Sequence, residues 1–166
     1  MPLLLPYDRA AAVEYARKWA LSRNPKYYNY DPLGGDCTNF ASQCVLAGGG
    51  VMNHTPTFGW YYNSANDHSP SWTGVEYLYN FLTRKAGGPG PVAHEVGIAD
   101  VQPGDISQFA GTSARFSHTQ VVVEAGKRGG LEDILVCTHT YDSLDRPLST
   151  YEYLKLRFLH IEGIRR

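Results

Sequence analysis

All helix-forming segments of this chain precede its strand-forming segments, and this order is the strongest constraint on its fold. Apolar side chains recur at helical spacing in three early segments: residues 7–24, 36–47 and 73–86. Four segments rich in β-branched or alternating apolar residues follow: 102–110, 118–125, 133–142 and 153–164. Helices that alternated with strands would indicate a parallel sheet, whereas segregated elements are typical of an α+β fold. The order therefore predicts N-terminal helices packed on a C-terminal antiparallel sheet.

Short local signals mark where several of these elements begin and end. Asp8 has the residue type of a helix N-cap, and the three glycines at 48–50 are a strong helix stop. Thr73 and the glutamate three residues later have the spacing of a capping box for the third helix. Residues 51–70 show no period and are polar and aromatic, which suits a surface loop over a site. The GKRGG segment at 126–130 is interpreted as a hairpin turn or the start of a longer loop.

Composition limits the class of protein. With 166 residues, 43% of them hydrophobic and 19% charged, we expect a single globular domain over residues 1–166. The formal net charge is −1 with scattered Lys and Arg, which argues against a nucleic-acid-binding surface. No segment approaches the roughly 20 apolar residues of a membrane span. The opening MPLLLP is too short and too weakly charged for a signal peptide, so a cytoplasmic protein and a domain of a secreted protein both stay open.

The stretch GGDCTNFASQC places Cys37 at the start of the second predicted helix. Three cysteines cannot all pair within one chain, so at least one thiol is free. A helix N-terminus favours a thiolate, and the glycines before Cys37 allow a tight turn that presents its amide to an oxyanion. We interpret Cys37 as a nucleophile, with a small buried apolar residue as the alternative. Cys44 and Cys137 are interpreted as structural.

A cysteine nucleophile needs an imidazole base and a third group that orients the imidazole. His118 begins one predicted strand and His139 lies near the end of the next, so antiparallel pairing would make them neighbours at one end of the sheet. Asp36 is interpreted as a helix-start cap or a substrate contact, because a nearby carboxylate would raise the pKa of the thiol. The remaining histidines are given no catalytic role: His54, His68, His94 and His160.

Seven motifs run along the chain in the order YDRAAAVEYARKWA, NPKYYNYDPLGGDCTNFASQCVLAGG, WYY, SWTGVEYLYNFL, PGDISQF, SHTQVVVE and THTYD. This series resembles the putative-amidase domain family of the papain-like cysteine peptidase superfamily, and the resemblance covers most of the chain. More distantly it resembles the NlpC-type endopeptidases and CHAP amidases. There an Asp-Cys pair starts a helix, a PGD turn leads into the sheet and a histidine begins a strand.

The resemblance implies a papain-like fold of the NlpC or CHAP type and a cysteine-dependent amidase or endopeptidase. Position by position, it implies Cys37 as nucleophile, His118 as base and His139 as the orienting third residue. The two residues after Cys37 differ from the usual Ser-Gly, and the gap between the two histidines is longer than usual. Asp142 therefore stays open as the alternative third residue.

The resemblance also implies a reaction and its substrates. A thiolate would attack an amide bond of a bacterial cell-wall peptide or a related peptide, form an acyl-enzyme and be released by water. This chemistry needs no metal and no organic cofactor. We expect a monomer that binds a peptide or peptidoglycan-type substrate, with no nucleic-acid partner and no membrane span.

Aromatic residues make up 13% of the chain and gather around the segment 51–70. Aromatic rings stack on both sugars and peptides, so four of these residues fit a substrate rim: Trp60, Tyr61, Tyr62 and Trp72. Ordinary core packing is the alternative for each, most of all for Trp72 beside a helix start.

Three other interpretations stay open from the sequence. Cys37, His118 and His139 could be three zinc ligands with an open fourth position, although their spacing matches no compact zinc signature. The chain could instead be a non-catalytic papain-fold module that binds a glycan, a peptide or a protein partner. A toxin or effector that cleaves or deamidates a protein is the third.

Overall fold

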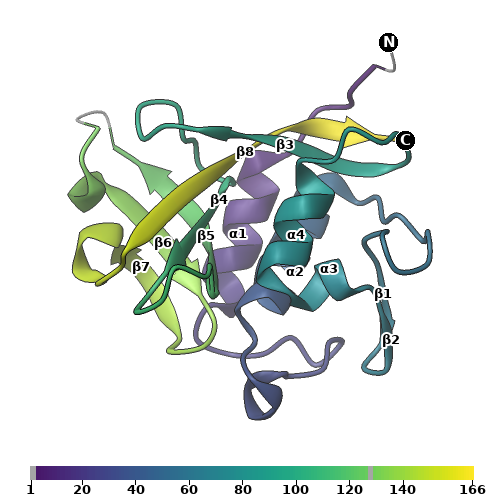
Figure 1. The fold of residues 1–166 in the computed structure, drawn as a ribbon, viewed down its shortest axis with the longest axis horizontal. Helices are drawn as coiled ribbons and strands as arrows, with labels where there is room; N and C mark the ends of the chain where they lie inside the picture. The colour runs from purple at the N-terminus through teal and green to yellow at the C-terminus, as the bar shows by residue number, and fades with distance from the viewer. Residues whose placement is uncertain (1–2, 127–128) are drawn as a thin grey trace.

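In a computed structural model that describes residues 3–126 and 129–166, the helices lie together against an antiparallel sheet (Figure 1). The helices are α1 (Arg9–Trp19), α2 (Cys37–Gly49), α3 (Pro70–Thr73) and α4 (Val75–Leu82), with 3-10 turns η1 (Asp31–Leu33), η2 (Leu131–Asp133) and η3 (Leu148–Thr150). The main sheet has the strand order β3 (Gly90–Val96), β8 (Lys155–Arg165), β4 (Ile106–Ala110), β5 (His118–Ala125), β6 (Ile134–Thr138) and β7 (Ser143–Pro147). All neighbouring strands are antiparallel, which confirms the α+β fold class.

The first two helices begin and end at the predicted signals. The Asp8 carboxylate accepts a hydrogen bond of 3.0 Å from the Ala11 amide, as an N-cap does. Helix α2 continues through two of the three glycines and ends at Gly50, whose φ of 67° is left-handed. The loop between the helices contains η1 and leads directly to Cys37.

Helix α4 exists as predicted, but the capping box does not. Its N-cap is Gly74, with no side-chain capping hydrogen bond. Thr73 instead closes the short helix α3, and its hydroxyl lies 3.3 Å from Nε2 of His68. The prediction was wrong because Pro70 starts a separate helical turn that takes up Thr73.

Four strands were predicted, and all four are present as β4, β5, β6 and β8. The sequence reasoning missed β3 and β7, the two edge strands of the sheet. Pro91 lies in β3 and Pro147 lies in β7. Proline cannot donate a hydrogen bond to a neighbouring strand, so it suits an edge strand and weakens the sequence signal for a strand. Of the predicted turn at 126–130, residues 127–128 lie outside the described residues, while β5 and β6 pair antiparallel on either side.

The sheet buries apolar side chains on both faces. Val121 and Val123 of β5 pack towards the helices, with Phe40 of α2. Val122 packs into a second cluster on the opposite face, with Leu148. This alternation places Thr119 on the helix side of β5 and His118 on the other side, at the end of the strand.

The aromatic segment 51–70 is more ordered than the prediction of a surface loop. It contains a two-stranded hairpin of β1 (Tyr62–Ser64) and β2 (Asp67–His68). Trp60 and Trp72 are 0% exposed and belong to the core on the helix side of the sheet. The prediction of a substrate rim was therefore wrong for these two tryptophans.

Two further sequence expectations can be compared with the structure. All three cysteines are free, which confirms that there is no disulfide framework. Within residues 3–126 and 129–166, no helix combines the length and the apolar character that crossing a bilayer requires.

Candidate active site

Cys37 is the first residue of α2, and two glycines make its position possible. Gly34 and Gly35 have φ values of 115° and 129°, a region that L side chains rarely adopt. A Cβ on Gly35 would also lie 3.1 Å from Oγ1 of Thr140. Only glycine allows the chain to turn into α2 this close to the segment after β6. Cys37 consequently lies at the helix N-terminus, 8% exposed.

The thiol of Cys37 lies at the end of the sheet, beside β5. The Thr38 hydroxyl is 3.8 Å from Sγ and 2.9 Å from the hydroxyl of Thr119. Burial raises the pKa of the Cys37 thiol, while N–H groups of Thr119 and Thr38 and the Thr38 hydroxyl act in the opposite direction. Burial thus acts against the thiolate that the helix N-terminus favours, and a reactive Cys37 thiolate stays a prediction. The Thr38–Thr119 contact places the start of α2 next to β5, at the residue that follows His118.

His118 is the first residue of β5 and is 9% exposed. Its ring packs against Phe109 of β4 and Tyr151, with centroid distances of 4.9 and 6.5 Å. Burial, and secondarily the positive charge of Arg146, lower the pKa of His118 to about 4. The imidazole is thus uncharged near neutral pH, as a general base must be.

The Thr138 hydroxyl contacts the ring of His118. It lies 3.1 Å from Nε2 of His118, and also 2.8 Å from the His139 carbonyl and 3.2 Å from the Thr119 carbonyl. The single hydroxyl proton can go to only one of these three acceptors, and where it goes to a carbonyl the Thr138 oxygen accepts from Nε2–H of His118. The lone pair of the neutral ring is then on Nδ1. Sequence reasoning missed Thr138, whose role depends on the β5–β6 register.

Cys37 and His118 lie at the same end of the sheet but do not touch through their functional atoms. Among the described residues, no hydrogen bond joins Sγ of Cys37 to the imidazole. A hollow of about 400 Å³ opens beside His118 and is also lined by Thr140, whose hydroxyl accepts a hydrogen bond of 2.8 Å from the Asp36 amide. The hollow therefore extends from the histidine towards the residue that precedes the thiol.

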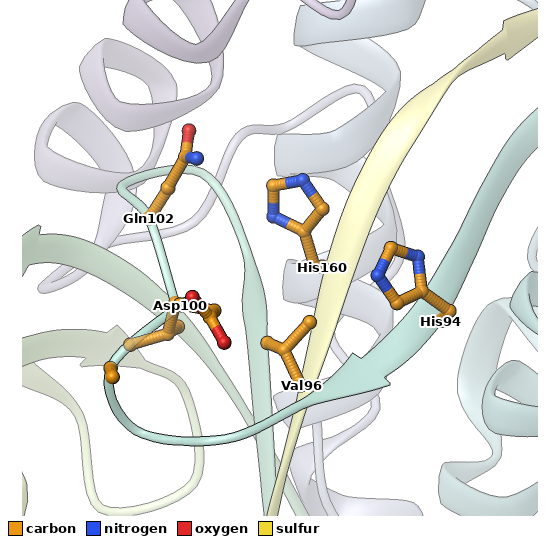
Figure 2. A pocket seen from close by; sticks show the side chains of 7 residues that line it. His94, Val96, Asp100, Gln102 and His160 are labelled. Carbon is orange, nitrogen blue, oxygen red and sulfur yellow. The ribbon is translucent and has the colours of Figure 1, made fainter.

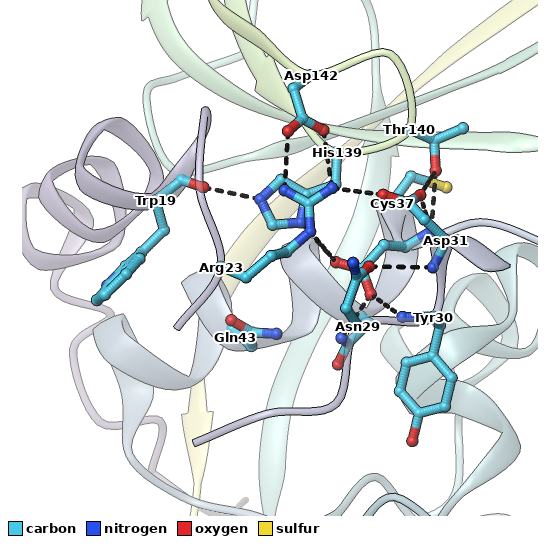
Figure 3. Close-up of polar contacts among 12 residues, drawn as sticks. Trp19, Arg23, Asn29, Tyr30, Asp31, Cys37, Gln43, His139, Thr140 and Asp142 are labelled. Atoms are coloured by element: carbon cyan, nitrogen blue, oxygen red, sulfur yellow. Dashed lines mark hydrogen bonds and ion pairs between the residues drawn. The ribbon is translucent and has the colours of Figure 1, made fainter. Parts of the chain in front are cut away.

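His139 lies on the other side of β6 and contacts Asp36 rather than His118 (Figure 3). Its Nδ1 is 2.5 Å from Oδ2 of Asp36, and its Nε2 is 2.7 Å from the Trp19 carbonyl. Both ring nitrogens are thus engaged, one by a carboxylate and one by a carbonyl, and neither bonds His118. The second Asp36 oxygen accepts from the Tyr30 amide and from Asn39, both at 2.8 Å. His139 and Asp36 thus hold α1, the loop and the start of α2 together.

Asp142, the alternative third residue, is engaged by Arg23 (Figure 3). Its two carboxylate oxygens lie 2.8 and 3.0 Å from the guanidinium of Arg23, which also bonds Asp31. Asp31 in turn accepts from the Thr140 hydroxyl at 2.9 Å. Thr140 and the next residue both have φ of 60°, a left-handed backbone that this network holds in place.

The two predicted tryptophans pack against α2 and are no part of a rim, whereas the rim role stays a prediction for Tyr61 and Tyr62. The indole N–H of Trp72 donates to Asn39 at 2.9 Å, and that of Trp60 donates to Ser42 at 3.1 Å. Tyr61 is half-buried and stacks on His54. Tyr62 is half-buried as well and lies in a cluster with Trp72. Asp36 is 1% exposed, so its carboxylate faces the protein rather than a substrate.

A second hollow, of about 420 Å³, lies beside β3 and β8 (Figure 2). His94 and His160 line it together with Asp100 and Gln102. His160 bonds the buried Asp105 at 2.9 Å, and Asp105 also pairs with Arg9 of α1. These contacts fasten β8 to α1, which accounts for His160 structurally.

The three residues of the zinc interpretation do not form a ligand set. Within the described part of the chain, no group of three or more His, Cys, Asp and Glu side chains is arranged to hold a metal ion. Both nitrogens of His139 are engaged by Asp36 and Trp19, as described above. The geometry gives the zinc alternative no support.

Comparisons with known proteins agree with the motif series. The sequence model of a family described as “Putative amidase domain” matches residues 6–161. The chain is also 38% identical over 141 residues to the uncharacterized protein YhbB of Bacillus subtilis (strain 168). That match covers 82% of this chain and 42% of YhbB, so the chain spans less than half the length of this relative. No solved structure matches the chain.

Proposed function

The chain belongs to the family described as “Putative amidase domain”, and from this premise we propose that it hydrolyses amide bonds with Cys37 as nucleophile and His118 as general base. One observation carries the assignment of residues. The Cys37 thiol lies at the N-terminus of α2, 3.8 Å from the Thr38 hydroxyl, which in turn lies 2.9 Å from the hydroxyl of Thr119, the residue next to His118. A thiol at a helix N-terminus, with an imidazole at the same end of the sheet, supports this proposal, because acyl transfer by cysteine requires a nucleophile and a base that can both reach the substrate.

The first step starts from a neutral pair. Because burial raises the pKa of Cys37 and lowers that of His118, the proton stays on sulfur until a substrate is bound. Nδ1 of His118 then accepts that proton while sulfur attacks the amide carbon. The free protein holds the two groups too far apart for a hydrogen bond, so substrate binding must bring them together, as is common for catalytic contacts.

Backbone donors at the start of α2 then stabilise the oxyanion. The first N–H groups of a helix have no intrahelical acceptor, and the Cys37 amide is among them. The His118 imidazolium donates its proton to the leaving amine, and the C–N bond breaks to give a thioester. Water, deprotonated by the same histidine, releases the acid and the free thiol.

Thr138 and His139 are positioning residues in this proposal. Thr138 keeps the lone pair of His118 on Nδ1. His139 acts through Asp36, whose backbone precedes the nucleophile. The resemblance implied that His139 orients the base. In this proposal Thr138 orients His118, and His139 instead positions the start of α2 through Asp36.

Cell-wall peptides are the substrates we would test first, as the motif resemblance implies. The experiment incubates the protein with peptide fragments of bacterial cell wall and follows new amino groups by mass spectrometry. Cys37→Ala and His118→Ala should abolish release, and Cys137→Ala, which removes a thiol distant from the helix mouth, should retain it. Release that persists in Cys37→Ala would refute the assignment.

A non-catalytic binding module is the second candidate, and one observation favours it. The thiol is 8% exposed and is not hydrogen-bonded to an imidazole within the described residues. Under this alternative, wild type and Cys37→Ala bind the same peptides with equal affinity and neither cleaves them. Turnover by wild type alone decides for the hydrolase.

A further inference from the structure

We propose that Arg146 binds a carboxylate of the substrate, so that the hydrolase selects peptides with an acidic group near the scissile amide. This inference rests on the proposed function, because it uses the hollow beside His118 as the substrate site. Arg146 and His118 line that hollow together, with aromatic walls formed by Phe109, Tyr141 and Tyr151. Its volume, about 400 Å³, suits a segment of a peptide.

The charge of Arg146 is not neutralised by the protein. Four other arginines pair with acids: Arg9 with Asp105, Arg17 with Asp145, Arg23 with Asp142 and Arg157 with Glu76. Within residues 3–126 and 129–166, no carboxylate lies within 4.0 Å of the Arg146 guanidinium. Its neighbour Asp145 is engaged by Arg17 of α1 instead.

The guanidinium is nevertheless held in a fixed position. Its Nε donates to the Thr150 hydroxyl at 2.7 Å and one Nη2 hydrogen donates to the Thr150 carbonyl at 3.1 Å. The group also lies 3.8 Å over the Tyr151 ring. The remaining N–H groups, on Nη1 and Nη2, are free to form the two parallel bonds with which arginine binds carboxylates.

The positive charge of Arg146 also reaches the catalytic base. It is the second cause, after burial, of the lowered pKa of His118. A carboxylate bound to Arg146 would offset this charge and make His118 a stronger base when the acidic substrate is present. The same contact would therefore contribute to both selection and proton transfer.

The test measures binding separately from turnover. Short N-acetylated peptides carry Glu or Gln at each position in turn, and each is made with a free and with an amidated C-terminus. Binding is measured by calorimetry to Cys37→Ala, which keeps the hollow and lacks the nucleophile. We expect the carboxylate form to bind about 10-fold or more tighter than its amide, since a charge-assisted pair is worth this much. The two peptide pairs distinguish a side-chain carboxylate from a terminal one.

Variants then connect the preference to Arg146. In the Cys37→Ala background, Arg146→Gln should bring the carboxylate-to-amide ratio close to one, and Arg146→Lys should give an intermediate ratio. Lys85→Gln removes one positive charge at an exposed position outside the hollow and should leave the ratio unchanged. Thermal melting checks that each variant is folded.

The outcomes separate this inference from the proposed function. Equal binding of acidic and amide peptides, or a preference that survives Arg146→Gln in folded protein, overturns the inference. Acid-selective binding that depends on Arg146 supports it even if wild type cleaves no peptide, in which case the proposed hydrolysis fails alone. Cleavage by wild type without any acidic preference leaves the proposed function standing and overturns the inference.

Discussion

Nδ1 of His139 lies 2.5 Å from Oδ2 of Asp36, and this pair joins the end of β6 to the residue before Cys37. Both side chains are 1% exposed. The ring also donates to the Trp19 carbonyl, and the carboxylate also accepts from the Tyr30 amide. Three segments that are distant in sequence therefore meet at one buried pair, next to Cys37.

Removing either partner of this pair should strongly destabilise the fold. A buried charge left without its partner typically lowers the free energy of unfolding by about 3–5 kcal/mol, and we expect this for Asp36→Ala and His139→Ala. The double variant should be less destabilised than the sum of the two, because the partners act together. Urea denaturation measures all three.

Asp67→Ala is the control, since Asp67 is an exposed carboxylate in the β1–β2 hairpin. It should change the free energy of unfolding by about 0.5 kcal/mol or less. If the effects of Asp36→Ala and His139→Ala on the free energy of unfolding simply add, the two side chains do not stabilise the fold as a pair, which contradicts the role given to their contact.

Thr138→Val should impair catalysis more than folding. Valine preserves the shape but cannot accept from Nε2–H of His118, so the ring loses its fixed tautomer. We expect kcat/KM to fall by about 10-fold to 100-fold, as small misplacements of catalytic groups do. Thr138→Ser keeps the hydroxyl and should retain most of the activity.

Nitrogen NMR of the imidazole provides a readout that a purely structural role would not change. Wild type and Thr138→Ser should show the proton on Nε2 of His118, and Thr138→Val should show a mixture of tautomers. An unchanged tautomer in Thr138→Val would remove Thr138 from the mechanism.

Gly35→Ala tests the tight turn before Cys37. Its φ of 129° disfavours any side chain, and the new Cβ would press on Thr140 at 3.1 Å. We expect the free energy of unfolding to fall by about 2 kcal/mol or more. Gly34 has a φ of 115°, but a Cβ there would meet nothing within 4 Å, so Gly34→Ala should lower the free energy of unfolding only through backbone strain. Gly87→Ala meets nothing within 4 Å and should be neutral or slightly stabilising. Equal effects at all three positions would contradict this account.

The sequence predicted the place of Cys37 at the start of α2 better than it predicted which side chains contact His118. Cys37 follows from local signals, because glycines, an acid and an apolar helical period are all adjacent in the chain. His118 follows from the β-branched run that it opens. The residue that contacts His118 could not be predicted from the sequence, because it depends on the register of β5 and β6. A shift of one residue in that register moves a side chain to the other face of the sheet. Thr138 shares the His118 face, whereas His139 faces α1 and α2.

The other differences between the predictions and the structure arise from burial and from the composition of the edge strands. Tryptophans in a polar segment fit a rim as well as they fit a core, and only the packing of that segment on α2 decides between them. The strands β3 and β7 were missed because edge strands carry prolines and few apolar residues. The thiolate was expected from the helix N-terminus, and burial, which the sequence does not show, acts against it by raising the pKa of the Cys37 thiol.

His118 should titrate far below a normal histidine. Its pKa is lowered to about 4, so its NMR titration should show an inflection near 4 instead of near 6.5. An unfolded chain takes up this proton near pH 6.5, and the folded chain does so only near pH 4. The free energy of unfolding should therefore fall as the pH falls from about 6.5 to about 4.

Two variants check the causes of this shift. His118→Gln should lose less stability than wild type over the same pH range. Arg146→Gln should move the inflection upwards, because it removes the positive charge beside the ring. An inflection near 6.5 in wild type would show that the ring is neither buried nor affected by Arg146.

Alkylation of the three cysteines should separate the reactive thiol from the structural ones. Burial raises the pKa of all three thiols, that of Cys137 to about 11 and that of Cys44 well above its usual range. Cys37 is 8% exposed, whereas Cys44 and Cys137 are 0% exposed. With iodoacetamide on native protein, read by peptide mass spectrometry, Cys37 should therefore label first. Its rate should rise with pH through and above the free-thiol value of roughly 8.5, with no plateau at low pH. Rapid labelling of Cys37 at pH 6 that is lost in His118→Ala would show instead that a thiolate–imidazolium pair exists before substrate binds. The neutral starting pair of the proposed mechanism would then be wrong.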